Sequence, residues 1–193
     1  MPDLTPEFQI VAAKLTGLQR STGNEHYWAT DCERTIFQNS GAPNCVVGTP
    51  GLEARYAASG AEIYYHHSHP DERALSPSDL DLLTRDGVIQ VWAHTPEGGS
   101  YGSELKAGVT RANFRKALND LRGFMCAEIL RLDCLPTLTD EDFEQFRDLA
   151  ALEAFEMATL IDVHVRLSDK MRRMILPKSD LHIRMREYFH SKL

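Results

Sequence analysis

Two histidines separated by one residue lie in the segment of the chain best suited to chemistry. His67 and His69 follow residues 61–66, a run of strand-forming residues, and alternate residues of a strand project to the same side. Neutral imidazole is a good zinc ligand at about 2.0–2.1 Å. A catalytic zinc site also needs a third protein ligand and an open position for water. Asp79, ten residues after His69 and at an expected helix start, can fold back to supply that ligand.

A zinc site of this kind can activate a water molecule as a nucleophile for hydrolysis at neutral pH. Zinc lowers the pKa of a bound water molecule to about 7. Hydrolysis then requires a base for the water proton and a hydrogen-bond donor for the oxyanion that develops on the substrate. Ser76 lies three residues before Asp79, and its hydroxyl is a candidate donor. The base must be a carboxylate from another part of the chain.

The order of these residues resembles a known motif. His67-x-His69-Pro70 followed by Ser76-x-x-Asp79 is similar to the JAMM motif of deubiquitinating isopeptidases, prokaryotic JAB peptidases and RadC-type proteins. The resemblance covers residues 5–106 and implies an MPN-type fold, a mixed sheet flanked by helices. The segment 91–101 is similar to the strand and hairpin that follow the motif helix in prokaryotic and phage-encoded members.

The resemblance also implies roles for single residues. Its two histidine ligands of Zn²⁺ correspond to His67 and His69, and its aspartate ligand to Asp79. Ser76 corresponds to the oxyanion serine. The general base of the family is a glutamate on an early strand, which Glu25 matches best because it follows a Thr-Gly-Asn turn and opens the first expected strand.

Two points of this alignment stay open at the level of sequence. Six residues separate His69 from Ser76, where the family usually has seven, and a second register would use Ser78 and Asp81 with eight. The first register is preferred because it places Asp79 at the helix start. Three further glutamates compete with Glu25 for the role of base, namely Glu33, Glu53 and Glu62.

The remaining pattern predicts an α+β protein with a helical C-terminal extension. Strands are expected at 25–29, 34–38, 44–48, 61–66, 88–93 and 100–105, and helices at 6–18, 51–59, 78–86, 111–133, 140–175 and 179–191. The predicted domains are a JAB/MPN-like metallohydrolase unit at 1–109 and a helical unit at 110–193 that packs on it.

Composition narrows the classes of partner. The net charge is −7, and residues 1–109 hold seven basic against fourteen acidic side chains, which disfavours nucleic acid as a partner. No apolar run is long enough to cross a membrane. The four cysteines, Cys32, Cys45, Cys126 and Cys134, are scattered, so we expect reduced thiols and a cytoplasmic location.

These observations favour a zinc-dependent hydrolase that cleaves a peptide or isopeptide bond, with ubiquitin-like conjugates as the substrate class implied by the resemblance. One alternative is a non-catalytic MPN-like module that binds a partner through its helical half. Another is a RadC-like accessory protein linked to DNA. The sequence does not determine the oligomeric state.

Overall fold

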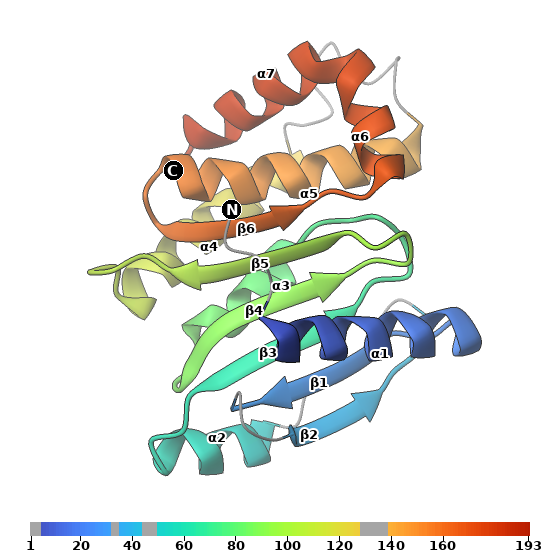
Figure 1. Ribbon diagram of the computed structural model, residues 1–193. Helices are drawn as coiled ribbons and strands as arrows, with labels where there is room; N and C mark the ends of the chain where they lie inside the picture. Colours follow the sequence, from blue (N-terminus) through green and yellow to red (C-terminus); the bar gives the residue numbers. More distant parts are fainter. Residues whose placement is uncertain (1–4, 32–34, 44–49, 128–138) are drawn as a thin grey trace.

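Six strands form one mixed sheet in the computed structural model, which describes residues 5–31, 35–43, 50–127 and 139–193 (Figure 1). The order across the sheet is β2-β1-β3-β4-β5-β6. The strands are β1 (His26–Thr30), β2 (Thr35–Ser40), β3 (Ile63–Ser68), β4 (Val88–His94), β5 (Ser100–Leu105) and β6 (Ile161–Arg166). Among them β3 and β4 pair in parallel, and every other neighbouring pair is antiparallel.

The parallel pair matters for the site because parallel strands need a crossover connection. Here the crossover leaves β3 after Ser68, forms the short helix α3 (Pro77–Leu80) and the 3-10 turn η1 (Asp81–Thr84), and enters β4 at Val88. The crossover therefore starts at the carboxyl end of β3. His67 and His69 lie at this end of the strand.

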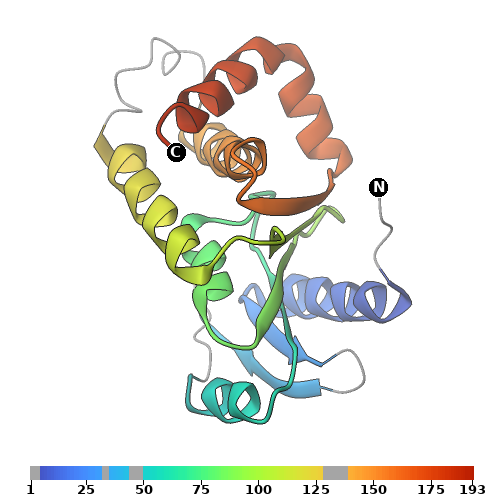
Figure 2. The same ribbon diagram turned by 90° about the vertical axis from the view of Figure 1, so that its left-hand side faces the viewer.

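Helix α1 (Pro6–Thr22) covers one face of the sheet, as the edge-on view in Figure 2 shows. Thr5 caps its N-terminus with a hydroxyl that accepts a hydrogen bond from the Phe8 amide, and Gly23 caps its C-terminus with a positive φ of 72° that suits glycine. Phe8 is buried and its ring packs edge-on against the His66 ring, 4.6 Å between centroids. The α1 side of β3 is therefore occupied by packed rings.

The opposite face of the sheet carries the main core, formed with the crossover and the later helices. These helices are α4 (Arg111–Ala127), α5 (Asp140–Met157), α6 (Asp169–Ile175) and α7 (Ser179–His190), with a 3-10 turn η4 (Leu176–Lys178) between the last two. Helix α2 (Pro50–Ala58) precedes β3. Fully buried side chains of this core include Ile63, Tyr65, Leu75, Leu80, Leu83, Tyr101, Phe114, Leu118, Phe146 and Phe155. The core thus joins residues from both sides of position 110.

The expected continuous helix over 140–175 is wrong. Helix α5 ends at Met157, Thr159 adopts a positive φ of 58°, and Ile161–Arg166 forms the edge strand β6 against β5. The reason lies in the segment Ile-Asp-Val-His-Val-Arg, which alternates β-branched and polar residues with a period of two. The part of the chain expected to be all helical therefore completes the sheet of the first part.

The α+β class is confirmed, and most of the other expected elements occur within a few residues of their expected bounds. Several expectations fall outside the described residues: the strand 44–48, the end of the helix 111–133, and the residues Glu33, Cys32, Cys45 and Cys134. The side chain of Cys126 also lies outside the described part. Within the described part, none of the helices combines the length and apolar character needed to cross a membrane.

Candidate metal centre

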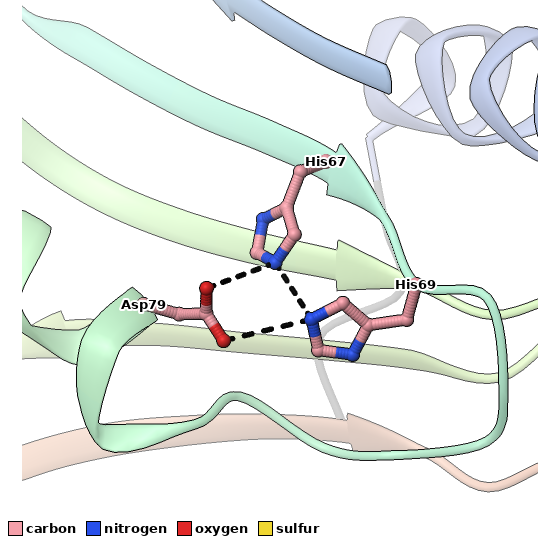
Figure 3. A group of neighbouring side chains, drawn as sticks. All are labelled: His67, His69 and Asp79. Carbon is pink, nitrogen blue, oxygen red and sulfur yellow. Dashed lines mark hydrogen bonds and ion pairs between the residues drawn. The ribbon is translucent and has the colours of Figure 1, made fainter. Parts of the chain in front are cut away.

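Three side chains converge at the carboxyl end of β3 (Figure 3). The Nε2 atoms of His67 and His69 lie 2.8 Å apart. The carboxylate of Asp79 faces both rings, with Oδ1 3.2 Å from His67 Nε2 and Oδ2 3.5 Å from His69 Nε2. The structure therefore brings together the two histidines and the aspartate that the sequence singles out, as a group able to bind a metal ion.

Local structure explains how Asp79 reaches the histidines. Ser76 caps the N-terminus of α3: its Oγ accepts a hydrogen bond from the Asp79 amide at 3.3 Å, and its own amide donates to Asp79 Oδ2 at 2.7 Å. This reciprocal capping box, with Pro77 in the first turn of the helix, holds the Asp79 side chain so that it faces the sheet. The same carboxylate thus caps its helix and faces the two imidazoles.

A backbone carbonyl orients the second histidine. His69 Nδ1 lies 2.9 Å from the Arg73 carbonyl oxygen, which can only accept, so Nδ1 carries the proton and donates. The other nitrogen, Nε2, consequently points toward His67 and Asp79. Metal-binding histidines commonly have such an outer hydrogen bond, which sets the ring orientation and the nitrogen that meets the metal.

The charges in this group stabilise one another strongly. Burial alone would lower the pKa of His69, but the hydrogen bond and charge of Asp79, with the Arg73 carbonyl and Glu25, raise it to about 9. Burial opposes ionisation of Asp79 as well, yet the charges and hydrogen bonds of His67 and His69 hold its pKa well below the usual range. Without a metal ion the group therefore contains an imidazolium and a carboxylate.

The donor set and its dimensions fit a small divalent metal ion. Two imidazole nitrogens at about 2.0–2.1 Å in a tetrahedral arrangement would be about 3.3 Å apart. The two nitrogens are 2.8 Å apart, and each lies 3.2 or 3.5 Å from one of the two Asp79 oxygens, so the distances bracket that value. Imidazole and carboxylate suit zinc, but also iron and other transition metals, so this geometry supports a metal site without specifying the ion.

Strand register places Glu25 beside the same group. In the antiparallel β1–β3 pair Tyr27 lies opposite His67, so the continued register sets Glu25 opposite His69 and on the same face. Glu25 is buried, with 9% of its surface exposed. Burial raises the pKa of its carboxyl, the charges of His69 and His67 lower it, and the Asp79 charge raises it further. Glu25 therefore lies within electrostatic reach of all three residues.

The competing glutamates lie elsewhere or are not described. Glu62 precedes β3, five residues before His67, which corresponds to about 17 Å of extended strand, and its carboxylate accepts a hydrogen bond from Tyr64. Glu53 belongs to α2, which Figure 1 places near the start of β3, whereas His67 lies at the carboxyl end of that strand. Among the described glutamates that competed for the role, Glu25 is the one at the histidine end of the strand.

The second possible register is not supported by the geometry. Ser78 is exposed, and Asp81 approaches Arg122 of α4 at 3.9 Å instead of facing the histidines. Ser76 and Asp79 are the serine and aspartate that lie at the group. The Ser76 oxygen accepts from the Asp79 amide, which leaves its O–H free to donate to another acceptor.

His66 lies on the opposite face of β3, as its neighbouring position in the strand predicts. Its Nδ1 is 3.0 Å from His94 Nε2, and its ring is fully buried beneath Phe8. Burial lowers the pKa of His66 to about 3, so the ring is neutral. This pair therefore packs behind the candidate metal centre and takes no part in it.

Sequence reasoning missed the residues that hold the loop after His69. Glu72 is 1% exposed and accepts hydrogen bonds from the Thr95 hydroxyl at 2.8 Å and the Glu97 amide at 2.9 Å, which ties the loop to the β4–β5 hairpin. Arg73 supplies the carbonyl for His69. The partners of Glu72 lie 23 and 25 residues away in the chain, and the Arg73 carbonyl is a backbone group that any residue carries, so no local side-chain pattern could have identified either role.

No family model matches the chain, and no curated protein or solved structure matches it. A function for the protein must therefore be argued from the residues of the site and from the resemblance of its motif.

Proposed function

We propose that this protein is a zinc-dependent hydrolase that cleaves a peptide or isopeptide bond. The observation that carries the proposal is the convergence of two imidazole nitrogens and one carboxylate, with a second, buried carboxylate beside them. His67, His69 and Asp79 would hold the ion, and Glu25 would act as the base. A bound Zn²⁺ supplies Lewis acidity, which lowers the pKa of water and polarises an amide carbonyl.

The second carboxylate is what favours hydrolysis over other metal chemistry. Two histidines and one carboxylate also form the facial triad of iron oxygenases. Hydrolysis needs a nearby base in addition, and efficient proton transfer needs a base whose pKa approaches the working pH. Glu25 lies at the site, and burial moves its pKa upward, in the required direction.

Each protein group then has one task. The Glu25 carboxylate takes a proton from the attacking water and later delivers it to the leaving amine, so that the carbon–nitrogen bond breaks without releasing an amide anion. The Ser76 O–H donates a hydrogen bond to the oxygen of the carbonyl under attack, where negative charge develops. The Arg73 carbonyl keeps the His69 ring in one orientation.

The substrate class is an inference from the motif alone. Resemblance to the JAMM family makes protein or peptide amides the first candidates, and isopeptide-linked ubiquitin-like conjugates the leading group among them. Because substrate choice depends on surface loops outside the motif, a screen should include both kinds.

Elemental analysis and one conservative variant test the proposal. We expect about one zinc per chain in the wild type and in Asp81→Asn, and loss of zinc in Asp79→Ala with the fold retained by circular dichroism. Glu25→Gln should keep its zinc and lose turnover of peptide–coumarin or isopeptide-linked substrates by about a hundredfold or more.

Other results would favour other functions. Stoichiometric iron in anaerobically purified protein would contradict a zinc enzyme. Zinc binding with no turnover of any substrate, and no effect of Glu25→Gln, would favour the partner-binding module. Salt-dependent binding to duplex DNA would favour the accessory protein, which the acidic first part of the chain argues against.

A further inference from the structure

Two of the three candidate ligands, His69 and Asp79, lie outside the sheet, and side chains from the helices after residue 110 hold the two segments that carry them. One segment is the first part of the crossover, the loop from His69 to Ser76, and the other is its second part, from Pro77 to Val88, which contains Asp79. Helices α4 and α5 contact them through charged groups. These contacts suggest a task for a part of the chain that the motif does not explain.

Three arginines of α4 donate hydrogen bonds to backbone carbonyls of the second part of the crossover. Arg111, Arg115 and Arg122 are spaced by four and seven residues, which places them on one face of the helix. Arg111 donates to the carbonyl of Arg85 at 2.9 Å and to that of Val88 at 3.2 Å, and Arg115 donates to the carbonyl of Thr84 at 3.0 Å.

The third arginine acts closest to the site. Arg122 donates to the carbonyl of Pro77 at 2.7 Å, and Pro77 lies in the same turn of α3 as Asp79. Its guanidinium also approaches Asp81 at 3.9 Å. Since a guanidinium carries a full charge, its hydrogen bond to a carbonyl is stronger than one between neutral groups. Arg122 therefore fixes the helix turn that presents Asp79.

Helix α5 holds the loop through one ion pair. Glu144 Oε2 lies 2.8 Å from Arg73 Nη1, and the Arg73 guanidinium also binds the carboxylate of Asp71, 2.9 Å from its Oδ2. The carbonyl of Arg73 is the acceptor for His69 Nδ1. A single residue thus joins α5 to the ring that faces His67 and Asp79.

The helices themselves are firmly placed. Leu118 and Leu121 of α4 and Phe146 of α5 are fully buried, and Leu149 is 1% exposed. Packed side chains of this kind resist displacement because any shift opens a cavity or a clash. Charged groups that extend from such helices can therefore define the position of the softer loop and turn.

We propose that Arg122 and Glu144 are positioning residues of the metal centre, which hold Asp79 and His69 at the separation a metal ion requires. The inference rests on the proposed metal binding and deepens it: α4 and α5 form a support on which the site depends. Groups that hydrogen-bond directly to a metal ligand typically affect metal affinity by about 10- to 100-fold. Arg122 and Glu144 act through one intervening residue, so we expect an effect near the lower end of that range.

Metal affinity and ligand geometry test this proposal directly. Zn²⁺ affinity is measured by competition with a chromophoric chelator, and the absorption bands of the Co²⁺-loaded protein report the coordination geometry. We expect Arg122→Met and Glu144→Ala to weaken Zn²⁺ binding about tenfold or more and to change the Co²⁺ bands. Arg122→Lys, which retains a charged donor, should restore most of the affinity.

A double-variant cycle tests the route through the loop. Arg73→Met should weaken Zn²⁺ binding at least as much as Glu144→Ala does. The double variant should bind Zn²⁺ no more weakly than Arg73→Met alone. Additive losses would contradict action of Glu144 through Arg73.

Two control substitutions separate positioning from general stability. Lys116→Met removes an exposed ion pair with Asp120 on α4, away from the site. Glu153→Ala removes the 2.9 Å contact of α5 with His182 of α7 and should lower the unfolding temperature. Neither control should change Zn²⁺ affinity or the Co²⁺ bands.

The outcomes distinguish this inference from the proposed function. Wild-type affinity and Co²⁺ bands in both Arg122→Met and Glu144→Ala would overturn it, as would an equal loss of affinity in Glu153→Ala. If Arg122→Met does not fold, Arg122→Lys and Glu144→Ala still decide the question. A wild type that takes up no metal would overturn the proposed function, and the positioning role with it.

Discussion

Substitution of Asp79 by asparagine tests the electrostatics of the metal-free site. The Asp79 carboxylate lies 3.2 Å from His67 Nε2 and 3.5 Å from His69 Nε2, and it accepts a hydrogen bond from the Ser76 amide. Asparagine keeps the size of the side chain and an oxygen for the Ser76 amide, but it carries no charge. The variant therefore removes the ion pair while preserving the helix cap.

The size of the effect follows from the pKa of His69. In the folded protein it is about 9, against an ordinary value of 6.5. Each pKa unit corresponds to about 1.4 kcal/mol, so the protonated ring stabilises the metal-free fold by about 3 kcal/mol. The lowered pKa of Asp79 reflects the same interaction seen from its partner, so it adds nothing further.

The direction of the His69 pKa shift determines the pH range over which this stability is lost. A histidine whose pKa is raised on folding contributes its full stability below the unfolded value, and this contribution disappears as the pH rises through the folded value. We therefore expect the chelator-treated wild type to lose about 3 kcal/mol more unfolding free energy than Asp79→Asn between pH 6 and pH 9.5. Urea unfolding at both pH values measures this difference.

Asp81→Asn is the matched control, because Asp81 lies two residues away and faces Arg122. It should show the same pH dependence as the wild type. Parallel pH profiles for the wild type and Asp79→Asn would refute the reasoning, since they would mean that the carboxylate does not stabilise the protonated ring. A nuclear magnetic resonance titration of His69 would give its pKa independently.

Four further predictions concern the scaffold. Glu72→Ala should cost about 2–3 kcal/mol in urea unfolding, because the two donors of the β4–β5 hairpin lose a buried carboxylate. Gly102→Ala should cost about 1–3 kcal/mol and shift tryptophan fluorescence, since an added Cβ would lie 2.6 Å from the Trp92 ring. Gly123→Ala, in an open position of α4, should instead stabilise the protein by about 0.5–1 kcal/mol. A fragment of residues 1–109 should show no cooperative unfolding, because the later helices fill its core; a sharp transition would contradict this.

Local patterns were sufficient for the parts of the protein that local interactions determine. The alternation of side chains along a strand predicts that His67 and His69 share a side and that His66 faces away. The Ser76-x-x-Asp79 spacing predicts a helix start, and the capping box forms through hydrogen bonds between residues three apart. Most helices and strands were likewise expected near their observed positions, since periodicity and caps act over short distances.

Only the tertiary structure decided which distant residues meet. The sequence offered four glutamates, and the β1–β3 register is what sets Glu25 opposite His69. The segment Ile161–Arg166 alternates as a strand does, but it forms β6 because β5 offers an edge to pair with, and only the tertiary structure shows that edge. Arg122 and Glu144 reach Pro77 and Arg73 across 45 and 71 residues of chain. Such contacts depend on how helices and sheet pack around a shared core, and that packing is a property of the whole chain.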